Sequence, residues 1–469
     1  MTETKEKEVP SGKCTGAAGT DRLGTEPIGR MLFSLAAPAI AAQIINLLYN
    51  MVDRIYIGHI ADIGQLALTG VGVCVPLITL ISAFAALAGM GAAPRASIYL
   101  GKGDKEKAEQ TLGNSVTLLF FIAITLTVLF SLFSEDLLMM FGASENTIPY
   151  AVEYMKIYCL GTLFVQFTLG LNAFITAQGF AKTSMLTVMI GAITNIILDP
   201  ILIFGLNMGV AGAALATIIS QGISMIWILK FLTGKKTTLK IRRKNLKLDS
   251  KIILPSLALG LSPFIMQSTE SLLSICFNSS LLKYGGDVAV AAMTISSSVM
   301  QFSLLPLQGL TQGAQPIISY NFGAQKLERV KKAFKILLFS CVGYSMVLWA
   351  LVMVFPHVFI SIFNNNTELV EFGVPCLRTY MAVSGIFGIQ IACQQTFIAL
   401  GNAKNSLFLA LLRKIILLIP LIYIMPAIFT ADKTMAVFLA EPVADFLAVT
   451  TTATMFAKYF GKVMRSGER

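Results

Sequence analysis

Five acidic side chains lie inside long apolar stretches of the sequence, where a charge needs either a chemical role or a partner. They are Asp53, Asp199, Glu270, Glu441 and Asp445. A carboxylate at the centre of a bilayer costs about 2.5–3.5 kcal/mol on insertion scales, so such residues mark ion pathways, proton relays or ion pairs. A desolvated carboxyl group can exchange a proton near neutral pH, or it can bind a cation. Both histidines fall in predicted exterior loops, so cation chemistry must rest on the carboxylates.

Asn195 and Asp199 form one candidate site for a cation. They are four residues apart, so they share one face of a helix. Their oxygens can bind Na⁺, or the amide can hydrogen-bond a protonated carboxyl group. Pro200 follows directly, so the alternative role for Asp199 is to cap a helix break at the proline.

Asp53 and Glu270 complete the predicted cation-coupling set. Asp53 lies late in its apolar stretch, where an ion pair with Arg54 or Arg378 is the alternative. Adjacent helical residues diverge by about 100°, which makes a direct bond to Arg54 awkward. Glu270 lies near the centre of another stretch and has polar neighbours at helical spacing, such as Gln267.

Glu441 and Asp445 share a helix face on either side of Pro442. The sequence leaves open whether this pair is functional or structural.

Uncharged polar residues and methionines supply the predicted substrate contacts. A polar face of the first apolar stretch, extended by Asp53, carries three of them, and the others lie in the eighth and tenth stretches. The set is Gln43, Asn46, Asn50, Met293, Met300 and Gln394. The alternatives are helix packing and helix–helix hydrogen bonds, which are worth about 0.6 kcal/mol each on average.

The composition indicates that these residues lie in membrane-spanning segments. Of 469 residues, 55% are hydrophobic and 13% charged, and the mean hydropathy is +0.74; a soluble domain carries about 25% charged residues. Apolar runs of this length predict membrane-spanning helices, because the backbone must be hydrogen-bonded within each span. The alternating ten-residue segments of a β-barrel do not appear. We predict twelve spans, near 31–57, 66–92, 111–133, 150–177, 184–206, 210–232, 252–281, 288–315, 335–356, 373–399, 406–429 and 434–457.

The distribution of basic residues predicts that both termini are cytoplasmic. With twelve spans, most of the 36 lysines and arginines fall on one side, as the positive-inside rule requires. They are expected to contact anionic lipid headgroups rather than nucleic acid. We predict an all-α membrane protein with a disordered tail (1–30), two six-helix bundles (31–232 and 252–457) joined by a solvated basic linker (233–251), and a C-terminal tail (458–469).

The two halves repeat each other at an offset of 222 residues. GAAPRASIYLGKGDKEKA from Gly91 matches GAQPIISYNFGAQKLERV from Gly313, and Gly179-Phe-Ala-Lys182 matches Gly401-Asn-Ala-Lys404. Each half has an even number of spans, so the bundles should be related by a pseudo-twofold axis along the membrane normal.

Several segments together resemble the multidrug and toxic compound extrusion (MATE) family. They include YNMVDRIYIG, GMGAAPRASIYLGKGDKEKA, NIILDPILIF, GVAGAALATIISQ, QGLTQGAQPIISYNFGAQ and AEPVAD, and their order covers nearly the whole chain after the tail. YNMVDRIYIG and NIILDPILIF look most like the MepA-like bacterial branch. The resemblance implies export of organic, often cationic, compounds in exchange for H⁺ or Na⁺. It also implies cation or substrate roles for Asp53, Asp199 and Glu270, and a structural role for AEPVAD.

The expected protein is therefore a monomeric plasma-membrane antiporter for small molecules, with no enzymatic activity. Its only expected ligand besides substrate is the coupling ion, H⁺ or, at Asn195 and Asp199, Na⁺; no other metal and no cofactor is predicted. A flippase for lipid-linked oligosaccharides is the alternative, but it predicts a basic central cavity, whereas the deep charges here are acidic.

Overall fold

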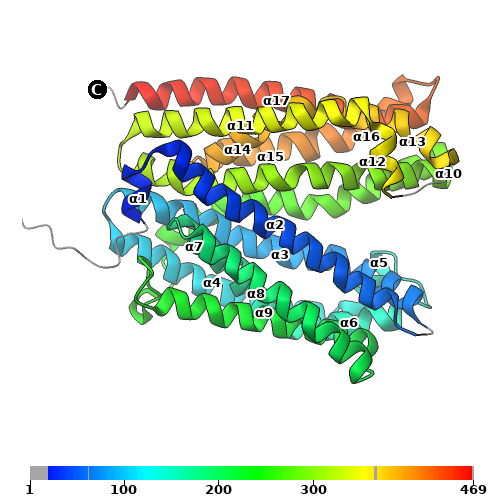
Figure 1. Ribbon diagram of the computed structural model, residues 1–469, viewed down its shortest axis with the longest axis horizontal. Helices are drawn as coiled ribbons and strands as arrows, with labels where there is room; N and C mark the ends of the chain where they lie inside the picture. Colours follow the sequence, from blue (N-terminus) through cyan, green and yellow to red (C-terminus); the bar gives the residue numbers. More distant parts are fainter. Residues whose placement is uncertain (1–19, 62, 364–366, 467–469) are drawn as a thin grey trace, which may run out of the picture.

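The computed structural model describes residues 20–61, 63–363 and 367–466, which form helices without strands. The helices gather in two bundles (Figure 1). A short helix, α1 (Thr20–Thr25), precedes them. The N-lobe contains α2 (Ile28–Gly58), α3 (Gly64–Gly101), α4 (Lys105–Leu132), α5 (Ser134–Met140), α6 (Ile148–Leu160), α7 (Thr162–Ala177), α8 (Ala181–Pro200) with a π-helical turn (Ile201–Gly205), and α9 (Gly209–Thr233).

The C-lobe begins with the longest helix of the structure. It contains α10 (Ser250–Gly323), α11 (Leu327–Val354), α12 (Pro356–Ser361), α13 (Thr367–Tyr380), a 3₁₀ turn (Ser384–Ile386), α14 (Phe387–Ala399), α15 (Ala403–Leu411) with a π-helical segment (Leu412–Leu418), α16 (Ile419–Ile428) and α17 (Lys433–Ser466).

The described helices account for twelve membrane crossings. Nine are long and apolar enough to span a bilayer, and two helix pairs, α6 with α7 and α13 with α14, form spans bent by 59° and 43°. That makes eleven, and α10 supplies two of the crossings rather than one. The predicted all-α fold with twelve spans in two bundles is confirmed.

Helix α10 must fold back on itself at Gly286, whose φ of 65° and ψ of −161° leave the helical region. A straight helix would separate Ser256 from Tyr320 by about 96 Å at 1.5 Å per residue. Both instead contact the same part of α3, because Ser256 lies against Gly91 and Tyr320 against Gly101. The two arms of α10 therefore correspond to the seventh and eighth predicted spans.

The two lobes meet through backbone contacts that obey the 222-residue repeat. A Cβ atom on Gly101 would lie 2.0 Å from the carbonyl oxygen of Tyr320, and one on Gly323 would lie 2.0 Å from that of Ile98. Adding 222 to 101 and 98 gives 323 and 320, so each contact is the image of the other. Reciprocal contacts of this kind are the signature of a twofold relation.

Interlobe contacts gather at the end of the molecule that carries α1. Gly313 packs on Ala36 and Gly309 on Ile40 in α2, while Phe84 of α3 stacks edge-on against Phe264 of α10 with 4.9 Å between ring centroids. Figure 1 shows the two bundles close together near α1 and diverging toward α5 and α12. The lobes are thus joined at one end and spread at the other.

Two predicted boundaries need correction. The expected tail (1–30) includes α1 and the start of α2, and Leu23 is buried against the C-lobe; residues 1–19 lie outside the described part. The linker (233–251) is not simply solvated, because Gln178 Oε1 accepts hydrogen bonds from the backbone N–H groups of Thr238 and Leu239. Its charged side chains are exposed except for the half-buried Lys240, while Thr237, Thr238, Leu239 and Asn245 are buried.

Candidate functional site

The N-lobe brings Asp53 together with Asn195 and Asp199, which the sequence placed on one helix face. Asp53 comes from the last turns of α2 and Asp199 from the end of α8, and these two helices pack against each other. The two carboxyl groups lie within hydrogen-bonding range. Asn195 Nδ2 donates to Asp199 Oδ1 at 3.3 Å, and the Asp199 side chain is completely buried. The site therefore faces the interior of the N-lobe.

Three oxygen atoms of this cluster are buried and lack a hydrogen-bond partner among the described residues. They are Asp53 Oδ1, Asn195 Oδ1 and Asp199 Oδ2. The described residues also form no salt bridge with either aspartate, so the alternative pairing of Asp53 with Arg54 or Arg378 is not made. Arg378 donates instead to the carbonyl oxygen of Met353 at 3.1 Å.

The local backbone explains how Asp199 is held. Pro200 does not end the helix, because the chain continues in a π-helical turn from Ile201 to Gly205. Turns of this type lodge one extra residue in a helix and are frequent at functional sites. Asp199 accepts its hydrogen bond from Asn195 rather than from a helix end, so the capping role weighed for it is not observed.

Two further residues border the pair. Tyr154 of α6 is buried, hydrogen-bonds Thr217 of α9 and lies within electrostatic range of Asp53. Neither was predicted, because a single tyrosine or threonine in an apolar span has no distinguishing pattern. They place hydroxyl groups from two more helices beside the carboxyl pair.

Helix α2 exposes two opposite faces along its second half. Ile44, Leu48, Met51 and Ile55 form an apolar face, and Asn46, Asn50 and Asp53 lie roughly half a turn away at 100° per residue. Asn46 and Asn50 are exposed, Gln43 is partly exposed, and Asn50 Nδ2 donates to the carbonyl oxygen of Asn46 at 2.6 Å. An apolar face suits lipid, and the opposite polar face suits a water-filled path between the lobes. The predicted substrate role of Gln43, Asn46 and Asn50 stays a prediction.

In the C-lobe, Glu270 pairs with Lys414, which lies within the predicted eleventh span (406–429). Lys414 lies in the π-helical segment inside the eleventh span, and its ammonium also donates to the carbonyl oxygen of Met266 at 3.3 Å. The lysine side chain is 4% exposed and the Glu270 side chain 57% exposed. Glu270 therefore already holds a cation supplied by the chain.

Arg413, the neighbour of Lys414, forms salt bridges with both members of the second acidic pair. Its Nη2 lies 2.9 Å from Glu441 Oε1 and its Nε lies 2.6 Å from Asp445 Oδ1. The guanidinium also stacks over Phe387, 4.5 Å from the ring centroid. Glu441 and Asp445 thus join α17 to the π-helical segment, which favours the structural role that the sequence left open. A basic dipeptide ten residues into an apolar span was the signal that could have revealed both C-lobe pairs.

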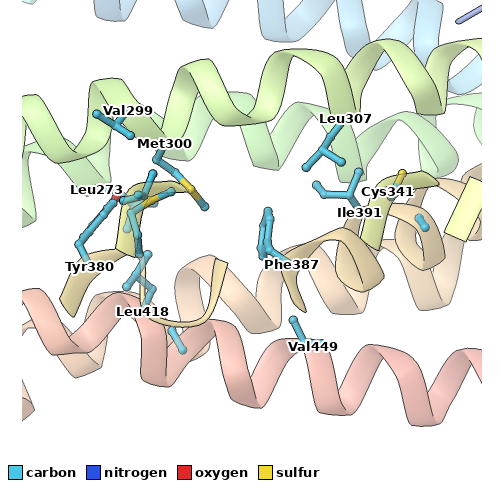
Figure 2. Close-up of a cluster of buried hydrophobic side chains, with 14 of the residues drawn as sticks. Leu273, Val299, Met300, Leu307, Cys341, Tyr380, Phe387, Ile391, Leu418 and Val449 are labelled. Atoms are coloured by element: carbon cyan, nitrogen blue, oxygen red, sulfur yellow. The ribbon is translucent and has the colours of Figure 1, made fainter. Parts of the chain in front are cut away.

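The other predicted substrate residues are buried by packing. Met293 and Met300 belong to the hydrophobic core of the C-lobe, where Met300 lies near Leu273 and Tyr380 (Figure 2). Gln394 is buried and donates to Ser262 Oγ at 3.4 Å. In this conformation all three make packing or helix–helix contacts, and their predicted substrate role stays a prediction.

The repeat shows that the carboxyl pair belongs to one lobe alone. At an offset of 222, the positions of Asp53, Asn195 and Asp199 correspond to Ile275, Leu417 and Leu421. The C-lobe is therefore apolar at these three positions, and its deep acidic side chains (Glu270, Glu441 and Asp445) are all joined to Arg413 or Lys414 in salt bridges.

Twelve apolar helices in two pseudo-symmetric lobes, with an uncompensated carboxyl pair in one of them, define a multi-pass membrane transporter. The family model MatE matches residues 38–201 and 263–424, and the chain belongs to this family, whose members are transporters rather than enzymes.

Comparisons with known proteins agree with this assignment. The multidrug export protein MepA of Staphylococcus haemolyticus is 27% identical over 420 residues, which cover 89% of this chain and 91% of that protein. MepA of Staphylococcus aureus is 27% identical over 408 residues, covering 86% and 88%. The fold is shared with a crystal structure of MATE in the bent conformation (TM-score 0.89, 22% identity, 96% of this chain and 99% of that one) and with an outward-facing multidrug resistance MATE family transporter (TM-score 0.87, 22% identity, 95% and 98%).

Proposed function

We propose that this chain is a secondary antiporter of the plasma membrane that exports organic cations in exchange for H⁺ or Na⁺. Asp53, Asn195 and Asp199 hold the coupling ion in the N-lobe. Transport proceeds by alternating access, in which the two lobes rock about their contact. Both termini face the cytoplasm, so the joined end of the lobes is the cytoplasmic end.

The buried carboxyl pair carries this proposal. Each buried polar atom left without a partner costs about 1–3 kcal/mol, so three such oxygens on Asp53, Asn195 and Asp199 favour a ligand at this cluster. A proton shared between the carboxyl groups satisfies two of them, and a sodium ion can take all three as ligands. Both ions add a positive charge to a pair that forms no salt bridge among the described residues.

Loading the pair can bias the conformation of the protein. Two unit charges about 4 Å apart repel by about 4 kcal/mol at an effective dielectric constant of 20. Moving a two-state equilibrium from 1:99 to 99:1 takes about 5.5 kcal/mol. The repulsion relieved by one cation is therefore of the size that a conformational switch needs, provided that the distance between α2 and α8 differs between the two states.

Charge also favours a cationic cargo. The polar face of α2 leads to Asp53, and the described residues form no salt bridge with Asp53 or Asp199. The relatives named above are multidrug exporters, which agrees with a wide cargo range.

Export from proteoliposomes tests the proposal. Purified protein is reconstituted, and efflux of a fluorescent organic cation such as ethidium is followed under a pH gradient alone and under a Na⁺ gradient alone. Asp53→Asn and Asp199→Asn should each abolish gradient-driven export. Glu441→Gln is the control, because it also replaces a carboxylate by an amide but lies outside the proposed coupling pair. The fraction of this variant that folds should keep gradient-driven export. Normal export by both aspartate variants under both gradients would refute the coupling site.

A further inference from the structure

A basic pocket lies on the surface where α11 begins. It is lined by Pro27 and Ile28 at the start of α2 and by five residues of the first turns of α11: Glu328, Arg329, Lys331, Lys332 and Lys335. Four of these five are basic and one is acidic. The cavity volume is about 430 Å³, which is within the range of pockets that bind small ligands.

Three of the four basic side chains are free to bind an anion. Arg329 is already engaged, because its Nη2 donates to the carbonyl oxygens of Leu23 and Glu26 at 3.2 and 2.7 Å. Lys331, Lys332 and Lys335 are exposed, and the described part of the chain contains no salt bridge to any of them. The pocket therefore carries a net positive charge, with Glu328 as the acidic residue among those that line it.

The repeat supplies an internal comparison. The equivalent surface of the N-lobe is the start of α4, where the position of Lys331 is taken by Glu109. There the chain provides its own counter-charges, because Arg242 Nε lies 2.7 Å from Glu109 Oε2 and Lys244 Nζ lies 2.9 Å from Glu106 Oε1. In the sequence repeat, the segment that corresponds to the basic linker is α1 together with the residues that precede it. Residues 1–19 contain three lysines and three glutamates, so they add no net negative charge.

The surroundings favour a lipid over a soluble anion. Lys332 and Lys335 lie on the same face of α11 as Phe339, which is 70% exposed one turn further into the apolar part of the helix. Phe33 is 76% exposed on the neighbouring start of α2. Basic groups at a helix end above exposed apolar side chains match a phosphate headgroup with acyl chains below it.

We propose that this pocket binds one anionic phospholipid, with its phosphate at Lys331, Lys332 and Lys335 and its acyl chains along Phe33 and Phe339. The pocket is lined by α2 of the N-lobe and α11 of the C-lobe. A bound lipid therefore joins the two lobes at the end where they already meet, and it should stabilise that closed end.

Lipid binding by the purified full-length protein tests the proposal. Native mass spectrometry counts phosphatidylglycerol adducts on the parent protein and on a Lys332→Gln/Lys335→Gln variant. The matched control is Lys102→Gln/Lys105→Gln, which removes two exposed lysines from the equivalent loop of the N-lobe. Each lysine near an anionic headgroup is worth about 1 kcal/mol, so the pocket variant should bind phosphatidylglycerol on the order of tenfold or more weakly, and the control should match the parent.

A thermal-unfolding measurement in detergent separates lipid from soluble anion. Phosphatidylglycerol should raise the unfolding temperature of the parent but not of the pocket variant, while inorganic phosphate and phosphatidylcholine should leave both unchanged. Equal phosphatidylglycerol binding by the parent and the pocket variant would overturn the site. Equal stabilisation by inorganic phosphate would overturn the assignment to a lipid, and equal loss in the control variant would show a nonspecific charge effect.

Discussion

In the ion pair between Glu270 and Lys414, the two side chains differ in burial, so removing one partner should destabilise the protein more than removing the other. The lysine side chain is 4% exposed and the glutamate side chain 57% exposed. Glu270→Gln removes the negative charge that balances the buried ammonium and leaves it with neutral acceptors such as the carbonyl oxygen of Met266. Breaking a fully buried pair costs about 3–5 kcal/mol, and the exposure of Glu270 reduces this to about 2 kcal/mol. Lys414→Met leaves a carboxylate that water can solvate, which should cost about 1 kcal/mol.

Thermal unfolding in detergent measures this difference. At about 2–4 °C per kcal/mol for a large domain, Glu270→Gln should lower the unfolding temperature by about 4–8 °C and Lys414→Met by about half as much. The double variant should be more stable than Glu270→Gln alone, because the stranded ammonium is gone. Glu106→Gln, which breaks an exposed pair with Lys244, is the control and should cost less than about 1 kcal/mol. A larger loss for Lys414→Met than for Glu270→Gln would refute this reading of the pair.

Three other predictions follow from packing and hydrogen bonding. Gly323→Ala places a Cβ against the carbonyl oxygen of Ile98, so it should force the lobes apart at their joined end. Export in a vesicle assay should fall several-fold. Gly343→Ala, where a Cβ meets nothing within 4 Å, should leave export unchanged. Arg413→Lys keeps the charge but loses the simultaneous contact with Glu441 and Asp445, so it should lower the unfolding temperature by several degrees. An unfolding temperature equal to that of the parent would contradict this prediction. Asn195→Ala removes one oxygen ligand and a hydrogen bond without changing charge, so it should weaken cation dependence of export by about tenfold; an unchanged dependence would exclude this amide from the site.

The membrane fold was predictable because its signals extend over long stretches of chain. Apolar runs and the charge bias between them predicted twelve spans, and the 222-residue offset predicted the twofold relation that Gly101 and Gly323 display. The Gly286 turn was expected only as a gap between two spans. The helix α1 was missed because six residues carry too little periodicity, and it is stabilised by contacts with the C-lobe such as Asn321 Nδ2 donating to the Leu23 carbonyl oxygen.

The candidate site was predictable only in the N-lobe. Asn195 and Asp199 are neighbours on one helix, so their spacing revealed them, and Asp53 stood out as an acid in an apolar run. In the C-lobe the partners of each ion pair come from different helices, so spacing along one helix could not reveal them. Met300 shows the converse limit, since a methionine in a span has the same pattern whether it packs in a core or lines a path.

Cation binding to the purified protein tests the central claim most directly. Isothermal titration of Na⁺ at fixed pH, paired with measurement of protons released into a weakly buffered solution, reports whether the two ions compete for one site. We expect one saturable signal, either Na⁺ binding or proton release. It should be lost in both Asp53→Asn and Asp199→Asn and kept in Glu441→Gln. The same event undiminished in the two aspartate variants would contradict an ion held by the N-lobe carboxyl pair.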